Sequence, residues 1–431
     1  MNKAMILITL LSLSASAGAA QMSLDDYKKA AMSNNHEIVE LTYEAESASQ
    51  AKKAAFTSYF PKLSGAVGGT NSDVFPGINA PVNFLPATAV SNGASVAELS
   101  LVQPVFAGGR IMNGNRLAET GAEAARYKLQ IKKNEVETES EKKYRTLQVL
   151  EGKMKTLLSY ERMMDALYSQ VSDAESRGVV TKNDLLRVTL KKREIQVKKD
   201  QLAKLIDIAA KDMKIYAGIP SGYAAELSED KSAVEEPEIS SGAFRGLVKN
   251  RPEYKLLEAG VKAAELSKKI KTGSYMPSVS AGISVFKVNY YRDNHFSESA
   301  SSYRDTAVFG IISVPISDWW EASHAVRDMK YKESSAREKL DSLGKYLVLD
   351  MENKKQAYET AYEQVLLAEI GIEQAAANRS EAEDGYKNGT EKLSDYLEAI
   401  AMETESENKM LEARSDYFVS RTAFSITVRG N

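Results

Sequence analysis

A stretch of about 65 residues without proline limits most strongly how this chain can fold. It runs from about Arg110 to Ser176, and such a helix is about 100 Å long at about 1.5 Å per residue. Its apolar residues follow a spacing of three and four that is typical of left-handed coiled coils. No compact domain holds a helix of that length. The repeating positions are Leu147, Leu150, Met154, Leu157, Met164 and Val171, with Glu161 and Tyr168 in the two remaining places.

The chain also contains an internal duplication. "NNHEIVELTYEAESASQAKKAAFTSYFPKLSGAVG", from Asn34, aligns with "NRPEYKLLEAGVKAAELSKKIKTGSYMPSVSAGIS", from Asn250. "LVQPVFAGGR" aligns with "ISVPISDWWE", and "RGVVTKNDLL" with "KNGTEKLSDYL". Three landmarks recurring in the same order indicate two copies of one unit. The second copy repeats the heptads at Ala336, Leu340, Leu343 and Leu347 and, after a phase shift, at Ala361, Val365, Ala368, Ile372 and Ala375.

Each copy is predicted to contain a helix, two strands and a long helical hairpin. The opening helix of the first copy is predicted to run from about Ser23 to Tyr59. The strands fall within residues 62–104 and 278–315, and the polar segment "RDNHFSESASSYRD" is predicted to be the loop of the second pair. Val279, Ala281, Ile283 and Val285 alternate with smaller or polar residues. So do Val308, Gly310, Ile312 and Val314, although Phe309 and Ile311 interrupt on the other face. Strands of about 10 residues with one apolar face are typical of transmembrane β-strands. A soluble hairpin is the alternative.

The start of the chain and its composition set further limits. Residues 1–19, with the apolar run "AMILITLLSL" and a small-residue A-x-A site, are typical of a secretory signal peptide. The absence of cysteine excludes disulfides and catalytic thiols. The 56 basic and 59 acidic residues are well mixed, which does not indicate a nucleic-acid binder. His36, His295 and His324 form no recognisable constellation, so we expect no enzyme activity, metal site or cofactor.

In these features the chain resembles the TolC-like outer membrane efflux protein family over essentially its whole mature length. The duplicated "SYFPKLS" and "SYMPSVS", the corner "LVQPVFAGGR" and the paired turns "RGVVTKNDLL" and "YKNGTEKLSDYLEA" carry the resemblance. The family fold is mostly α-helical. Duplicated helical hairpins form an α-barrel tunnel, and four transmembrane strands per chain complete a trimeric 12-stranded β-barrel. Open strand edges are not tolerated in lipid, which agrees with assembly from several copies.

The resemblance implies an outer-membrane exit duct, with its helical tunnel in the periplasm. Such a duct passively conducts substrates for a tripartite efflux pump or a type I secretion system. The expected partners are two further copies of the chain, a periplasmic membrane-fusion (adaptor) protein, an inner-membrane pump of RND, ABC or MFS type, and outer membrane lipid. The alternative is a periplasmic coiled-coil scaffold or adaptor without a pore. The expected parts are the repeats 20–217 and 241–431 and a linker or equatorial segment, 218–240.

The resemblance also assigns roles to individual residues. Asp395 and Glu398 correspond to carboxylates of a periplasmic gate, and Asp184, Tyr386, Asn183 and Glu391 to contacts that latch it. Glu391 replaces a basic residue, so its part in a latch is in doubt. The hairpin tips, expected to dock the adaptor, comprise Gly178, Val179, Val180, Gly389 and Thr390. Aromatic residues near the corners, expected at the membrane interface, are Tyr59, Phe60, Phe106, Tyr275, Trp319 and Trp320.

Overall fold

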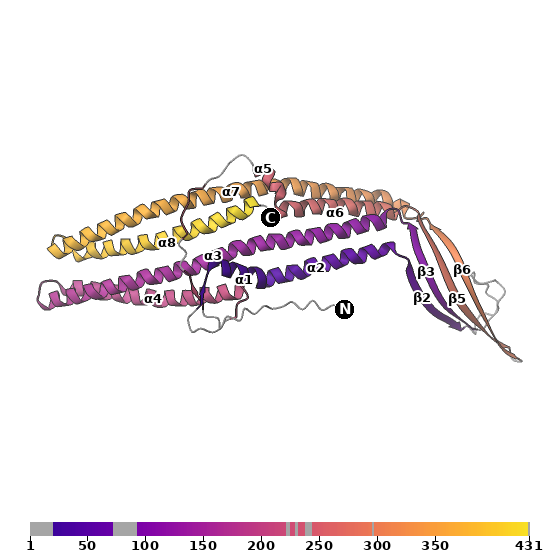
Figure 1. The fold of residues 1–431 in the computed structure, drawn as a ribbon, viewed down its shortest axis with the longest axis horizontal. Coiled ribbons are helices and arrows are strands. Elements are labelled where there is room, and N and C mark those ends of the chain that lie inside the picture. The colour runs from indigo at the N-terminus through magenta and orange to yellow at the C-terminus, as the bar shows by residue number, and fades with distance from the viewer. Residues whose placement is uncertain are drawn as a thin grey trace. The chain divides into compact units, whose positions relative to one another are not determined.

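A computed structural model describes residues 20–71, 93–220, 225–228, 232–237, 244–294 and 297–429. The predicted signal peptide, the segment 72–92, His295 and parts of the segment 218–240 lie outside the described residues. The fold is mostly helical with a four-stranded antiparallel sheet (Figure 1). Among the described residues, no helix has the length and apolar character needed to cross a membrane.

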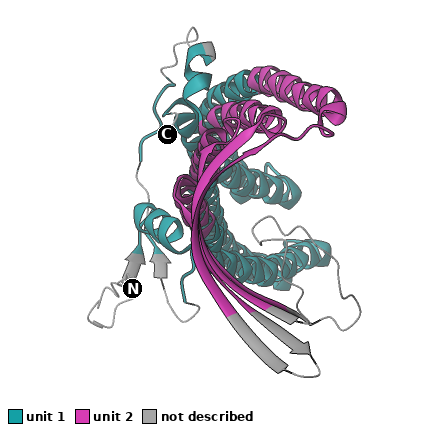
Figure 2. Cartoon of the chain, turned by 90° about the vertical axis from the view of Figure 1, so that its right-hand side faces the viewer, with its two compact units in different colours: residues 1–41, 129–251, 347–431 teal, residues 42–128, 252–346 magenta. Residues whose placement is uncertain are grey.

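The chain divides into two compact units that do not coincide with the sequence repeats (Figure 2). Unit 1 comprises residues 1–41, 129–251 and 347–431, and unit 2 comprises residues 42–128 and 252–346. Each unit therefore takes segments from both repeats.

Two helical hairpins build most of unit 1. The first joins α3 (Arg110–Ser176) to α4 (Lys182–Tyr216), and the second joins α7 (Trp319–Asn388) to α8 (Leu393–Arg429). The first part of α3, to residue 128, and of α7, to residue 346, belongs to unit 2. α3 has the predicted bounds. The predicted heptad positions of α3 and of the 361–375 run lie on the inner side: Leu147, Leu157, Met164, Val171, Ala361, Val365 and Ala375 are buried. One apolar cluster contains residues of both hairpins, so the hairpins pack against each other.

The other elements of unit 1 are short. They are β1 (Ala20–Met22), α1 (Leu24–Asn34), β4 (Ala225–Leu227), α5 (Phe244–Leu247) and the 3-10 helix Val248–Asn250. β1 pairs with β4 in parallel, and the buried Tyr144 donates its hydroxyl proton to the carbonyl oxygen of Met22 at 3.0 Å. The hydroxyl of Tyr417 accepts from the Glu235 amide at 2.9 Å and donates to its carbonyl at 2.8 Å. Two buried tyrosines thus hold the described parts of the linker against α3 and α8.

Unit 2 contains the sheet, in the order β2-β3-β5-β6. Its strands are β2 (Lys62–Asn71), β3 (Gly93–Phe106), β5 (Ser278–Asn294) and β6 (Ser297–Ser313). The helix α6 (Pro252–Ser274) leads into β5, while α2 (His36–Phe56) and the 3-10 helix Thr57–Tyr59 lead into β2. The opening helix predicted to continue from Ser23 is broken at Asn35, whose side-chain oxygen caps α2 by accepting from the Glu37 amide at 3.0 Å.

The polar segment predicted as the loop between the last two strands is mostly strand. β5 continues to Asn294 and β6 begins at Ser297, with Asn294 opposite Ser297. The prediction was wrong because it used apolar alternation, which marks only strand positions that face an apolar phase. Paired backbone groups are satisfied whatever the polarity of the side chains.

Candidate functional site

The two hairpin tips have the same backbone geometry. In the first, the Gly178 amide donates to the Glu175 carbonyl at 2.8 Å and the Val179 amide to the Ala174 carbonyl at 2.9 Å. In the second, the Gly389 amide donates to the Tyr386 carbonyl at 3.2 Å and the Thr390 amide to the Gly385 carbonyl at 2.9 Å. Both are Schellman motifs, and the glycines have φ of 74° and 72°. The duplication found in the sequence is therefore also present in the backbone structure of the two tips.

The helices that follow the two tips begin differently. Thr181 caps α4 in a capping box: its hydroxyl accepts from the Asp184 amide at 3.2 Å, and the Asp184 carboxylate accepts from the Thr181 amide at 3.2 Å. In the second hairpin Lys392 precedes the helix, and no lysine side chain can accept these bonds. The Asp395 carboxylate instead accepts from the Ser394 hydroxyl at 2.9 Å. Asp184 is engaged in a cap that Asp395 does not form.

Asp395 and Glu398 lie together on the exposed side of the first turns of α8. The residues between and beyond them point the other way: Tyr396, Leu397, Ala399 and Ile400 are buried in the cluster shared by the two hairpins. The buried side fixes the rotation of α8 about its axis. Packing of the buried side of α8 therefore keeps both carboxylates pointing away from the two hairpins.

Of the four predicted latch residues, Asp184 of α4 and Tyr386 of α7 lie near each other within one chain. Tyr386 packs against the shared cluster, and burial, followed by the nearby negative charge of Asp184, raises the pKa of its hydroxyl. Asn183 is exposed. Glu391 folds back on its own turn, since a methyl group at Gly385 would lie 2.7 Å from its Cγ. The structure thus brings Asp184 and Tyr386 together, and seats Glu391 against α7.

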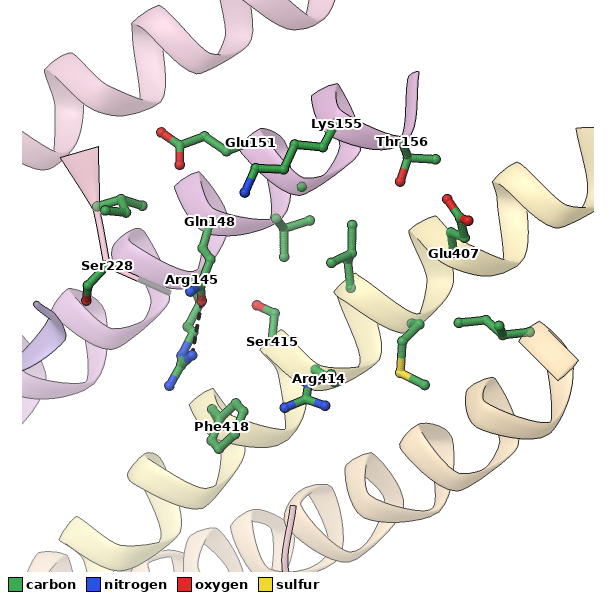
Figure 3. A pocket seen from close by; sticks show the side chains of 16 residues that line it. Arg145, Gln148, Glu151, Lys155, Thr156, Ser228, Glu407, Arg414, Ser415 and Phe418 are labelled. Atoms are coloured by element: carbon green, nitrogen blue, oxygen red, sulfur yellow. Dashed lines mark hydrogen bonds between the residues drawn. The ribbon is translucent and has the colours of Figure 1, made fainter. Parts of the chain in front are cut away.

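A groove of about 510 Å³ opens between α3 and α8 in unit 1 (Figure 3). Its buried Arg145 donates from Nε to Glu141 at 2.9 Å and from Nη1 to Gln148 at 3.0 Å, and its guanidinium lies 4.2 Å from the ring centroid of Phe418. No motif of the sequence marks Arg145 or Glu141. Their i,i+4 spacing was the available signal, but it is shared with many exposed pairs on these helices.

The sheet of unit 2 has two chemically different faces, which the strand register defines. Leu63, Leu101, Ile283 and Val308 form one continuous row across all four strands. Their exposed fractions are 67%, 39%, 41% and 81%, so this apolar face has no covering element in the described part of the chain. The predicted alternation on β5 and β6 belongs to this face.

The opposite face is more polar. Ser64, Ser100 and Ser284 share a row, the first two with their hydroxyl oxygens 2.8 Å apart, and Glu98 lies in the next row. Phe309, which interrupts the alternation of β6, lies over Gly282: a methyl group there would be 2.6 Å from the ring. A glycine covered by an aromatic ring in the neighbouring strand is a known stabilising pair.

The corners between strands and helices carry the predicted aromatic side chains. Trp319 donates from Nε1 to the Tyr275 carbonyl at 3.0 Å, and the Tyr275 hydroxyl donates to Glu321 at 3.0 Å. Trp320 is 87% exposed. Tyr59 and Phe60 both pack edge-on against Phe56, and Phe106 is about half exposed. The corner places large aromatic surface outside any core of the described residues.

These features define a class of fold: a four-stranded sheet with one exposed apolar face and two long helical hairpins in one chain. No family model and no curated protein sequence matches the chain. Solved structures do, and the fold is that of the TolC-like outer membrane channels, which confirms the resemblance at the level of the fold.

Three of these structures illustrate the likeness. The CmeC outer membrane channel of Campylobacter jejuni is 17% identical with a TM-score of 0.80, covering 94% of this chain and 85% of its own. The outer membrane protein VceC of Vibrio cholerae is 13% identical with a TM-score of 0.79, covering 94% and 95%. The open MtrE outer membrane channel of Neisseria gonorrhoeae is 15% identical with a TM-score of 0.76, covering 94% and 88%.

Proposed function

We propose that this chain is the outer-membrane exit duct of an export system. The observation that carries the proposal is the row Leu63, Leu101, Ile283 and Val308, an exposed apolar band that spans the whole sheet. In water such an exposed apolar band would favour aggregation, whereas in a bilayer it is the lipid-facing surface. The similarity in fold to outer membrane channels supports this assignment.

Three copies of the chain form the channel in this proposal. Among the described residues, β2 and β6 each have a neighbour on one side only. Their open edges require further strands in lipid, and three sheets of four strands close a 12-stranded barrel. The exposed aromatic residues at the corners, Trp320 above all, then lie at the membrane boundary nearest the helices, where Trp and Tyr are enriched.

The channel carries out no chemistry and passes what an inner-membrane pump delivers through an adaptor. Asp395 and Glu398, displayed by α8, form the gate, and Asp184 with Tyr386 holds neighbouring hairpins in the closed state. The tips at Gly178 and Gly389 contact the adaptor. Val179, beside the first tip glycine, is the strongest candidate for this contact. Its apolar side chain is 74% exposed to solvent.

Membrane fractionation tests the proposal. The chain should be extracted from outer membranes only by detergent and should run as a trimer that dissociates on heating. Recovery in the soluble periplasmic fraction would instead favour the scaffold alternative.

Crosslinking tests the adaptor contact. Because the chain lacks cysteine, Val179→Cys and Thr390→Cys each introduce a single reactive thiol. Both should crosslink to the adaptor in whole cells, whereas Arg162→Cys, exposed in the body of α3, should not. Equal crosslinking from all three positions would contradict docking at the tips.

A further inference from the structure

Two basic residues face each other on adjacent strands of the sheet. Lys287 of β5 is the direct register partner of Arg304 of β6, and both are exposed. Neither forms an ion pair with another described residue. Like charges directly opposite each other across strands destabilise a sheet. The pair therefore has an unfavourable arrangement that an anion between the two side chains would relieve.

The pair lies at one end of the apolar face. Lys287 and Arg304 continue the alternation of Ile283 and Val308 on the same side of the sheet, and the next row holds the polar pair Asn289 and Ser95, joined at 3.1 Å. From Val279 to Lys287 the strand rises about 26 Å. An outward-facing apolar band in such barrels is about 25 Å tall. The two cations thus mark the boundary of the band that is remote from the helix corners.

Among the described residues, the nearest acids on this face are Asp293 and Glu298, which the register places three rows beyond the pair. From Val279 to Asn289, and at the positions paired with them, the face carries no Asp or Glu; Glu98 and Asp305 alternate to the other face. The strand that would lie beside β6 in a closed barrel is β2 of a second copy. Its sequence, "KLSGAVGGTN", contains no acid either.

We infer that Lys287 and Arg304 bind the phosphate of an anionic lipid headgroup in the leaflet on that side of the membrane. The inference rests on the proposed function, because only a bilayer around the sheet places headgroups at this height. Arg offers two parallel donors to phosphate oxygens and Lys a mobile point charge, so together they enclose a phosphate from two strands.

Binding of a fluorescent phosphatidylglycerol tests the site. The full-length chain is placed in phosphatidylcholine nanodiscs, and the labelled lipid is titrated in. Each basic residue near an anionic surface contributes about fivefold in affinity, so the variant Lys287→Gln with Arg304→Gln should bind about 30-fold more weakly than the natural chain. The matched control is Arg327→Gln with Lys330→Gln, which removes the same two charges from the exposed surface of α7 outside the sheet.

The results separate the site from the proposed function. Saturable binding that is lost only in the Lys287 and Arg304 variant supports the site. Equal binding by this variant and the natural chain, or an equal loss in the control, overturns the site and leaves the channel proposal standing. Failure of the natural chain to enter the bilayer overturns both.

Discussion

Tyr386 of α7 lies almost parallel to Tyr396 of α8, with ring centroids 5.7 Å apart and planes inclined by 18°. The stack joins the two sides of the second hairpin one turn from its tip. Because Tyr386 also lies within reach of the Asp184 charge on α4, a single ring couples the two hairpins.

Loss of this ring should favour the open state of the proposed channel. An aromatic pair contributes about 0.5–1.5 kcal/mol beyond the burial of its surface, which corresponds to up to about tenfold in an equilibrium. Tyr386→Leu should raise single-channel open probability more than Tyr386→Phe, which keeps the stack and loses only the hydroxyl. The partner residue is best tested with Asp184→Asn, since an amide oxygen still accepts from Thr181 in the cap. Unchanged gating in all three variants would rule out the latch.

The acids at the start of α8 should set ion selectivity. Removing both charges in Asp395→Asn with Glu398→Gln should lower the preference for cations over anions, because carboxylates at a constriction attract cations. The reversal potential in a salt gradient across a planar bilayer reports this preference. Glu381→Gln, an exposed acid of α7, serves as the control and should leave it unchanged. The same shift in both variants would contradict the gate assignment.

The tip glycines should be sensitive to substitution. Gly178→Ala and Gly389→Ala force alanine into the left-handed region and should each cost about 1–2 kcal/mol of unfolding free energy. Gly371→Ala, inside α7 with open space around its α-carbon, should stabilise the chain by about 0.5–1 kcal/mol. Denaturant unfolding monitored by circular dichroism measures both effects. An unchanged unfolding free energy in both tip variants would mean that the turns accommodate alanine without strain.

These tips also show what the sequence could predict. The turns at Gly178 and Gly389 can be predicted locally, because a glycine at the end of a heptad run marks the end of the helix. The long helices can be predicted from the heptad periodicity alone. The role of Asp184 in a cap and the contact of Glu391 with Gly385 depend on how each turn closes in three dimensions. Asp184, whose charge acts on Tyr386, comes from the other repeat, so no local pattern links the two residues. The alternation of apolar side chains does not identify the polar ends of β5 and β6, because these ends are strand through backbone pairing.

Alkaline pH should destabilise unit 1 through Tyr216. Burial, helped by the charges of Glu139 and Glu37, raises the pKa of Tyr216 to about 12. The unfolded chain ionises its tyrosines near pH 10, so it releases the proton first, and stability falls as the pH rises from about 10 to about 12. Thermal melting at several pH values should show a shallower fall for Tyr216→Phe than for the natural chain. Tyr43→Phe, which changes an exposed tyrosine, should show the same fall in thermal stability with pH as the natural chain.

Tyr417→Phe should release the described part of the linker from α8. The substitution removes both hydrogen bonds to the backbone of Glu235, each worth about 0.5–1.5 kcal/mol net. Hydrogen exchange of the amides of residues 232–236 should accelerate about tenfold or more. Tyr362→Phe, which changes a neighbouring ring in the same cluster, provides the comparison. Equal protection in both variants would show that the remaining contacts hold the segment: the packing of Val234 and the bonds from Arg414 to the Ser232 carbonyl and from Arg421 to Glu235.

The open edges of β2 and β6 have a consequence for how the chain acquires its structure. A lone copy in lipid leaves two rows of backbone donors and acceptors without partners, so the sheet gains its last hydrogen bonds only when copies meet. Folding of the sheet and association of the copies are then one equilibrium, and the folded fraction depends on the number of copies present. For the proposed trimeric channel, a cell that makes little of this protein would lose channels in more than direct proportion to the chains it fails to make.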